Sequence, residues 1–179
     1  MNVTLFSDAS LCEKHRIGGW AAWLKSNRGT IRRGGAFRAH INDITIAEAQ
    51  AVVNGLFEGI RVGVIRQGDT VIIETDNDQV LGILHGTTLR KATLAVKTRR
   101  KISWKELKQE NQQRNGQIAE VARYFALAKA ALQLDFRWRH VKAHTTMRDP
   151  RSSLNRVCDR QAKAHMQAAR LAHLAKIAV

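Results

Sequence analysis

The stretch Val3-Thr-Leu-Phe-Ser-Asp-Ala-Ser10 decides how the rest of the chain is interpreted. Its apolar and β-branched residues predict a strand, and the acid that follows them predicts a carboxylate delivered to an opening at the strand's end. Asp8 is therefore the first candidate for a functional residue. Taken alone, an acid in this position more often caps a turn, so its role depends on other acids that converge on it.

Two more strands, a helix and a fourth strand are predicted after this first strand. Strand-like runs at Trp20–Leu24 and Thr30–Arg38 predict an antiparallel meander with the first strand. From Thr45 to about Arg61 the apolar residues recur at the spacing of an amphipathic helix. The β-branched run Thr70–Thr75 is apolar on both faces, as in a central strand covered by helices.

The second half of the chain supplies further helices and a last strand. The sequence predicts a short helix over Gln79–His85, a helix over Ile118–Leu132, a strand over Leu134–Val141 and an alanine-rich helix from about Ser153. A capping-box pattern over Ser103–Glu106 indicates one more helix start. This order predicts an α/β fold in one domain over residues 1–179, with a five-stranded mixed sheet flanked by helices.

Charge is the strongest signal in the composition. The 179 residues contain 30 Lys and Arg against 15 Asp and Glu, a formal net charge of +15, and the sequence pI is about 10.9. Such an excess neutralises phosphates and releases counterions, so nucleic acid is the expected partner and binding should depend strongly on salt.

Other compositional features exclude several classes of protein. No uninterrupted apolar run of about 18 residues and no secretory leader pattern is visible, so we expect no membrane association and a cytoplasmic location. Cys12 and Cys158 are too few for a disulfide framework, and free thiols are expected. Nothing in the sequence indicates an obligate protein partner.

A basic segment at about 86–115 carries nine lysines and arginines against two glutamates, Glu106 and Glu110. We interpret it as a surface that binds nucleic acid through its positive charge. One aromatic residue, Trp104, lies among the basic side chains and can stack on nucleotides. The alternative is an ordinary solvated helix. The residues expected to contact nucleic acid are Arg99, Arg100, Lys101, Trp104 and Lys105.

Four acids occupy positions that could converge. Asp8 is late in the first strand, Glu48 near the start of the first long helix, Asp76 at the end of the fourth strand and Asp159 in the first turns of the last helix. If the first and fourth strands are parallel neighbours, Asp8 and Asp76 lie side by side near the carboxyl edge of the sheet. Clustered carboxylates suit Mg²⁺ or Mn²⁺, and two such ions can catalyse phosphodiester hydrolysis.

Each of these acids also has a structural interpretation. Thr45-Ile-Ala-Glu48 is a capping-box pattern, so Glu48 could only close a helix start. Asp76 could cap the helix that follows it. Asp159 could pair with Lys163 one turn along the helix.

The chain also resembles a known family, the type 1 ribonucleases H, in five short motifs that occur in order. Ala47-Glu-Ala-Gln-Ala51 resembles that family's helix-borne Glu, and His140-Val-Lys-Ala-His144 resembles its Val-Lys-Gly-His loop. The remaining three are Phe6-Ser-Asp-Ala-Ser10, similar to its strand with Asp-Gly-Ser, Ile73-Glu-Thr-Asp-Asn77, similar to its Thr-Asp-Ser, and Asn155-Arg-Val-Cys-Asp159-Arg-Gln-Ala162, similar to its Asn-Glu-x-x-Asp-x-x-Ala helix.

This resemblance implies a ribonuclease H-like fold and hydrolysis of the RNA strand of an RNA–DNA hybrid by two metal ions, Mg²⁺ with Mn²⁺ as a substitute. By analogy Asp8 would bridge both ions, and Glu48 and Asp76 would complete the ion on the leaving-group side. Asp159 would hold the ion that activates water. His144 would assist proton transfer or product release, and the basic segment would be a handle for the DNA strand.

The chain also departs from the family in places that affect selectivity. Ile44 and Thr45 stand where the family commonly has an Asn pair that contacts the hybrid's minor groove, and Ala9 replaces a Gly. The interval from His144 to Asp159 is longer than usual.

Three other interpretations follow from these departures and from the residues. A structure-selective DNA endonuclease of the junction-resolvase type on the same fold is one. A catalytically silent nucleic-acid-binding module is another, favoured if Asp8 and Asp76 lie far apart or pair with basic side chains. A zinc site from His140, His144 and Cys158 is the third, but no fourth ligand is evident.

Overall fold

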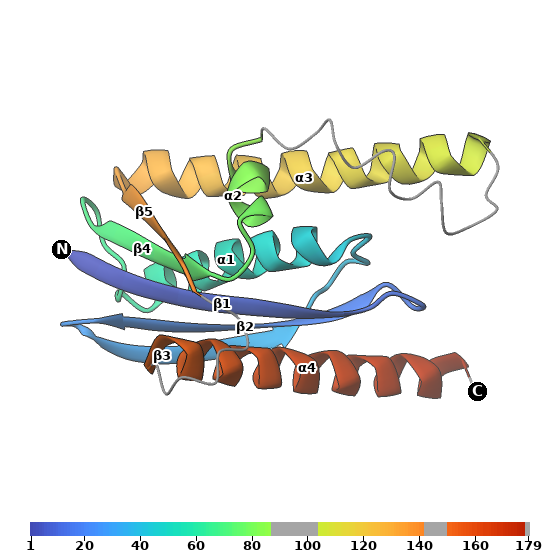
Figure 1. The fold of residues 1–179 in the computed structure, drawn as a ribbon, viewed down its shortest axis with the longest axis horizontal. Coiled ribbons are helices and arrows are strands. Elements are labelled where there is room, and N and C mark those ends of the chain that lie inside the picture. The colour runs from blue at the N-terminus through green and yellow to red at the C-terminus, as the bar shows by residue number, and fades with distance from the viewer. Residues whose placement is uncertain (87–103, 142–149, 178–179) are drawn as a thin grey trace.

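The computed structural model describes residues 1–86, 104–141 and 150–177, and Figure 1 shows one sheet with helices on both sides. In chain order the elements are β1 (Asn2–Cys12), β2 (Ile17–Ser26), β3 (Gly29–Ala36), α1 (Ile44–Arg61), β4 (Thr70–Thr75), α2 (Gln79–Leu84), α3 (Trp104–Leu132), β5 (Asp135–His140) and α4 (Pro150–Ile177). The predicted order of strands and helices is confirmed.

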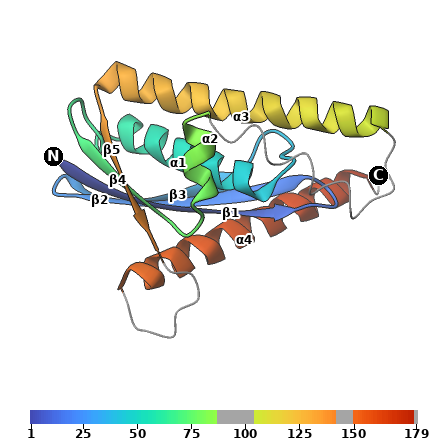
Figure 2. The same ribbon diagram turned by 45° about the horizontal axis from the view of Figure 1, so that its top comes forward.

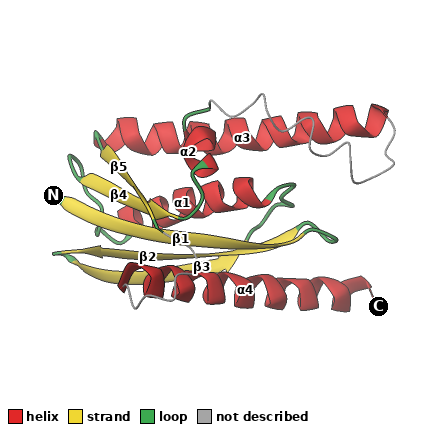
Figure 3. Cartoon of the chain, viewed as in Figure 1, coloured by secondary structure: helices red, strands yellow, loops and turns green. Residues whose placement is uncertain are grey.

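The sheet is mixed and has β1 at its centre (Figure 3). Its order is β3-β2-β1-β4-β5; β1 pairs with β2 and β2 with β3 in antiparallel fashion, whereas β1 with β4 and β4 with β5 are parallel. The predicted five-stranded mixed sheet and the parallel pairing of the first and fourth strands are therefore confirmed. This pairing is what aligns the two strand-borne acids.

Helices cover the two faces of the sheet unequally. In Figures 1 and 2, α1, α2 and α3 lie over one face and α4 alone over the other. The larger buried cluster, which includes Leu5, Leu24, Ile46, Leu56 and Ile73, fills the space under α1 and α3. A smaller cluster of Phe6, Ala21, Val141, Cys158 and Ala162 joins α4 to the other face. Apolar side chains thus join helices to both faces of the sheet.

The contact between α4 and the sheet depends on glycine. A Cβ placed on Gly19 of β2 would lie 2.4 Å from both Ala162 O and Met166 N, which are backbone atoms of α4. No side chain fits at that distance, so only glycine allows the helix backbone to approach the strand this closely. The approach fixes the position of α4 and hence of the residues that it carries.

Several predicted boundaries were wrong. The predicted helix over residues 118–132 is the second half of α3, which is described from Trp104 onward, and Ser103 of the predicted capping box lies outside the described residues. Polar residues in the first half of α3 weaken its periodic signal. β1 extends to Cys12, past the expected end of the strand, because β2 continues to pair with it as far as Ile17.

The start of α1 also differs from the capping-box alternative for Glu48. The N-cap is Asp43, whose Oδ1 accepts the Thr45 backbone N–H at 2.8 Å, and the helix begins at Ile44. Thr45 is therefore inside the helix and does not cap it. The Glu48 carboxylate has no role in closing this helix start and is free to face another element.

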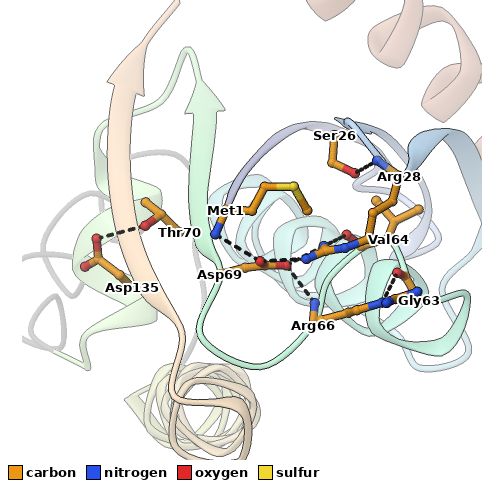
Figure 4. Close-up of polar contacts among 9 residues, drawn as sticks. All are labelled: Met1, Ser26, Arg28, Gly63, Val64, Arg66, Asp69, Thr70 and Asp135. Carbon is orange, nitrogen blue, oxygen red and sulfur yellow. Dashed lines mark hydrogen bonds and ion pairs between the residues drawn. The ribbon is translucent and has the colours of Figure 1, made fainter.

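A buried ion-pair network anchors the end of the sheet at which β1 and β4 begin (Figure 4). Asp69, whose side chain is only 2% exposed, accepts two bonds from the Arg28 guanidinium at 2.6 and 2.9 Å and pairs with the Met1 amino group at 3.2 Å. The Arg66 backbone N–H donates to the same carboxylate at 2.8 Å. These bonds tie the β2–β3 turn to the beginnings of β1 and β4, which sets the register of the parallel pair.

Within the described residues, no helix is both long enough and apolar enough to cross a bilayer.

Candidate active site

The parallel pair β1 and β4 places two acids next to each other. The last partners in their register are Phe6 and Glu74, and two further residues along each chain are Asp8 and Asp76. β4 ends at Thr75, while Asp8 remains paired with Ala21 of β2. We expected Asp8 at the end of its own strand. It lies instead inside β1, level with the point where the neighbouring strand β4 ends. The resulting edge is where open α/β sheets bind ligands.

The other three predicted acids all influence Asp8 at this edge. Burial raises the pKa of the Asp8 carboxyl to about 7, and the negative charges of Asp76, Asp159 and Glu48 add to the rise. The Ala9 backbone N–H, which donates to Asp8 Oδ1 at 2.7 Å, opposes it. Because each of the other three acids contributes, the structure brings all four together around Asp8.

Glu48 faces this group from α1 and is held by an amide. Asn77 Nδ2 donates to Glu48 Oε2 at 2.5 Å. Burial raises the pKa of Glu48 to about 7, the bond from Asn77 lowers it, and the charges of Asp76 and Asp43 raise it further. The Asn77 amide thus fixes the Glu48 carboxylate without neutralising its charge.

α4 brings two residues to the same edge, one helical turn apart. Asn155 Nδ2 donates to Asp76 Oδ2 at 3.0 Å, so Asp76 is held by a second amide. Asp159, with a 33% exposed side chain, pairs with Lys163 at 2.9 Å, as the structural interpretation of this acid predicted. An exposed pair of this kind contributes at most about 1 kcal/mol, so it does not prevent Asp159 from binding a cation.

The donor chemistry of these acids fits a divalent cation. Asp8, Glu48, Asp76 and Asp159 are all partly accessible to solvent, and the first two have raised pKa values because burial, and to a lesser extent the charges of neighbouring acids, disfavours their ionised forms. Across residues 1–86, 104–141 and 150–177, no group of three or more His, Cys, Asp or Glu side chains is arranged to hold a metal ion. Mg²⁺ is usually bound by one or two carboxylates together with waters, so an open arrangement of oxygens suits it.

Most of the predicted nucleic-acid contacts fall outside the described part of the chain. Arg99, Arg100 and Lys101 all lie there, as does His144, the residue predicted to assist proton transfer or product release. Trp104 and Lys105 begin α3, and the Trp104 side chain is 72% exposed. This exposure is consistent with stacking on a nucleotide, which stays a prediction.

The zinc interpretation is not favoured by the two of its three residues that are described. Burial and the nearby charge of Asp8 raise the pKa of the Cys158 thiol to about 12, so the thiolate that zinc requires is disfavoured. His140 Nδ1 is 3.0 Å from Asp78 Oδ1 and lies on exposed β5. Neither residue is prepared for a shared metal.

Sequence reasoning missed the residues that hold the acids. Asn77 and Asn155 belong to two of the predicted motifs. The motifs do not indicate that Asn77 bonds to Glu48 or that Asn155 bonds to Asp76. Their positions offered a signal, since Asn77 directly follows Asp76 and Asn155 precedes Asp159 by one turn. Glu74 was also missed: its side chain is 2% exposed and lies 3.4 Å from Arg139 and 3.7 Å from Arg151.

Two hollows of the described chain lie away from the acids. One of about 560 Å³ is bordered by α1 and α3, and one of about 620 Å³ by α3 and the β1–β2 turn; none of the four acids lines either. The acids occupy an open edge instead, which suits a large substrate better than a small enclosed one.

Comparisons with known proteins bear on the family and the fold of the chain. The sequence model of the RNase H family matches residues 1–167. An N-terminal RNase H domain from Mycobacterium tuberculosis, solved as a fusion with maltose-binding protein, is similar with a TM-score of 0.60 and 14% identity, covering 96% of this chain and 98% of that one. RNase H1 from Halobacterium salinarum is similar with a TM-score of 0.52 and 16% identity, covering 94% and 100%. Identities this low show a shared fold alone, and no curated protein sequence matches the chain.

Proposed function

The chain belongs to the RNase H family, whose model it matches over residues 1–167, and on this premise we propose that it hydrolyses the RNA strand of RNA–DNA hybrids with two divalent ions. The enzyme class, ribonuclease H, follows from the family. The two-ion mechanism, the preference for Mg²⁺ over Mn²⁺ and the cytoplasmic location belong to the proposal.

The resemblance to type 1 ribonucleases H assigns each acid a role. By that resemblance Asp8, whose pKa is raised in part by the charges of the other three acids, would be a ligand of both ions. Glu48 and Asp76, each held by an amide, would bind the ion on the leaving-group side, and Asp159 would bind the ion on the water side. Ions bound there would lower the pKa of water and stabilise the leaving oxygen.

The amide partners preserve the charge that such ligands need. An arginine or lysine bonded to Asp76 would compete with a cation, whereas the Asn155 amide orients the carboxylate and leaves its charge in place. This is the opposite of what a silent binding module predicts, since that module would pair Asp8 or Asp76 with basic side chains. In the proposed mechanism His144 carries a proton or assists product release.

The observation that carries the proposal is the parallel register of β1 and β4, which places Asp8 beside Asp76, with Asp159 and Glu48 near enough for their charges to help raise the pKa of Asp8. A buried Asp8 carboxylate with three other acids nearby destabilises the fold at neutral pH unless a cation is bound. A binding module would gain nothing from retaining this repulsion.

Substrate selectivity rests on residues that differ from the family pattern. Thr45 is buried inside α1, so of the two positions that carry the family's Asn pair only Ile44, 40% exposed, reaches the surface. Ile44 offers no hydrogen bond to a minor-groove edge. Hybrid recognition must therefore depend more on backbone contacts, which are sensitive to salt and weakly selective.

The test compares cleavage of an RNA–DNA hybrid, double-stranded RNA, duplex DNA and a four-way DNA junction, in Mg²⁺ and then Mn²⁺. The unmodified chain is compared with Asp76→Asn and with Asp135→Asn, a matched change at an exposed acid of β5. We expect cutting confined to the RNA strand of the hybrid, abolished by Asp76→Asn and retained in Asp135→Asn. Cutting of the junction with the hybrid left intact would contradict the proposal and favour a resolvase.

A further inference from the structure

α4 carries a row of positive side chains on the face that points away from the sheet. Its sheet side is marked by the buried residues Asn155, Cys158 and Ala162. Spacings of four, three and seven residues place four exposed cations along one line on the opposite side of the helix. We call this line the α4 ridge, and it consists of Arg156, Arg160, Lys163 and Arg170.

The ridge is poorly compensated by negative charge. Asp159 is the only acid between residues 150 and 177, and it pairs with Lys163. Within the described chain, Arg156, Arg160 and Arg170 form no ion pair with an acid. Like charges four residues apart, such as Arg156 and Arg160, destabilise a helix by a few tenths of a kcal/mol. An ordinary solvated helix face would intersperse acids, so the ridge indicates an anionic partner outside the chain.

The ridge continues into a second group of basic side chains at the β1–β2 turn. The His15 and His173 rings lie 5.7 Å apart between centroids, which joins the turn to α4. The pKa of His15 is lowered by partial burial and then by the positive charges of Lys14, His173 and Arg170. Lys14 and His15 also border the hollow of about 620 Å³ beside α3. Lys14 and Arg170 therefore carry positive charge from α4 to this turn, on either side of His15.

The ridge lies next to Asp159, on the side of the sheet away from α1 and α3. Asp159 is a neighbour of Arg156, Arg160 and Lys163 on α4, whereas α1 and α3 cover the other face (Figures 1 and 2). From Arg156 to Arg170 the helix rises about 21 Å at 1.5 Å per residue. A B-form duplex has about six base pairs in that length, enough for contacts to several phosphates.

We propose that the α4 ridge binds the phosphate backbone of the nucleic-acid duplex that flanks the cleavage site, a contact that rests on the proposed function for its substrate. This contact would add to any that the basic segment at 86–115 makes with the same duplex. Three of the four ridge cations are arginines, whose planar guanidinium groups can contact a phosphate with two bonds. Backbone contacts of this type explain how a chain with Ile44 at the groove can still bind its substrate.

The test measures binding without cleavage. The full chain carrying Asp76→Asn is titrated with a labelled RNA–DNA hybrid of about 24 base pairs over a series of salt concentrations. Replacing Arg156, Arg160 and Arg170 with Gln removes three phosphate contacts, and at about 0.9 per phosphate the slope of log K against log salt falls by about 2.7. Raising the salt from about 50 to 200 mM lowers the binding constant of every variant. We expect this fold-loss to be about 40 times smaller for the triple variant than for the chain with its ridge arginines. Lys163 is left unchanged because it pairs with Asp159.

A matched control removes the same charge elsewhere. Lys25, Arg66 and Lys129 are exposed cations on β2, the loop before β4 and α3, and their replacement by Gln should change the slope much less. Replacement of the three ridge arginines by Lys keeps the charge and should keep the slope. Melting curves check that each variant is folded.

The outcomes separate this proposal from the proposed function. Equal slopes in the ridge and control variants overturn the ridge as a duplex contact, even if the unmodified chain cleaves hybrids. A ridge-dependent slope in a chain that cleaves no hybrid supports the ridge and contradicts the ribonuclease proposal. Ridge-dependent binding to anionic lipid vesicles, with unchanged slopes on nucleic acid, also overturns it and assigns the ridge to a membrane surface.

Discussion

Asn155 of α4 donates a hydrogen bond to the Asp76 carboxylate at the end of β4, with 3.0 Å between Nδ2 and Oδ2. Asn155 is 7% exposed, so water cannot readily replace it. We expect Asn155→Ala to lower Mg²⁺ affinity or cleavage about 10- to 100-fold, the usual cost of losing the partner of a metal ligand. Calorimetric titration of Mg²⁺ and steady-state cleavage of a hybrid measure the two effects.

A double-mutant cycle shows whether Asn155 acts through Asp76. In an Asp76→Asn background, Asn155→Ala should change Mg²⁺ affinity little further. Equal losses in both backgrounds would mean that Asn155 supports the site through general packing of α4.

Asn77 should set the pH at which Glu48 becomes available to a cation. Its bond to Glu48 opposes the burial that raises the pKa of this carboxyl to about 7. In Asn77→Ala that opposition is lost, so the pKa rises further and the pH of half-maximal Mg²⁺ binding moves upward. Asn77→Ser retains a hydroxyl donor, so the pH of half-maximal Mg²⁺ binding should shift less in this variant.

The matched control for Asn77→Ala is Asn54→Ala, which removes an amide from α1 that bonds only to Gln50 among the contacts seen. Titrations of Mg²⁺ at several pH values should be the same for Asn54→Ala and the unmodified chain. A downward shift in Asn77→Ala would contradict the role given to this amide.

Asp8→Asn should stabilise the metal-free protein while abolishing cleavage. The pKa of Asp8 is raised from 3.8 to about 7, so the folded chain binds this proton more strongly than the unfolded chain does. Stability is therefore lost as pH rises from about 4 to 7, and at about 1.4 kcal/mol per pKa unit the loss is on the order of 4 kcal/mol at most. The Tm of Asp8→Asn in EDTA should exceed that of the unmodified chain at pH 8, with little difference at pH 4. Asp135→Asn should raise it at neither pH.

The Asp69 network at the other end of the sheet has the opposite pH dependence. Bonds from Arg28 hold the pKa of Asp69 well below its usual range, against the effect of burial. Its contribution is present above about pH 4 and is lost as pH falls below the ordinary pKa of an aspartate. Asp69→Asn leaves Arg28 without its buried partner and should cost about 3–5 kcal/mol in urea unfolding at pH 7. Glu58→Gln, which breaks a more exposed pair with Arg61, should cost less than about 1 kcal/mol.

Gly19→Ala should displace α4 and with it Asp159. The added Cβ would lie 2.4 Å from two backbone atoms of α4, so the helix must move. We expect a loss of about 1–3 kcal/mol and reduced cleavage. Gly35→Ala on β3 adds the same atom 3.6 Å from Trp20 Nε1, an ordinary contact, and should be tolerated. Equal Tm values for the two variants would contradict the close approach.

The sequence predicted the strands and the four acids because both leave local signals. The β-branched run of β4 and the alternating run of β1 identify strands, and acids that follow them stand out. The length of α3 escaped prediction because its polar first half lacks an apolar stripe. The Asn77 and Asn155 contacts escaped it because an amide pairs with a carboxylate only through tertiary geometry, and no spacing in the chain encodes which acid it reaches.

The smaller buried cluster under α4 has a consequence for how the chain folds. Phe6 and Ala21 lie on β1 and β2, near the start of the chain, while Cys158 and Ala162 come from a helix more than a hundred residues later. Until α4 docks, this face of the sheet stays apolar and uncovered, so a partly folded chain is prone to self-association. Docking of α4 covers that face and delivers Asp159 in the same step, so aggregation resistance and catalytic competence should be acquired together.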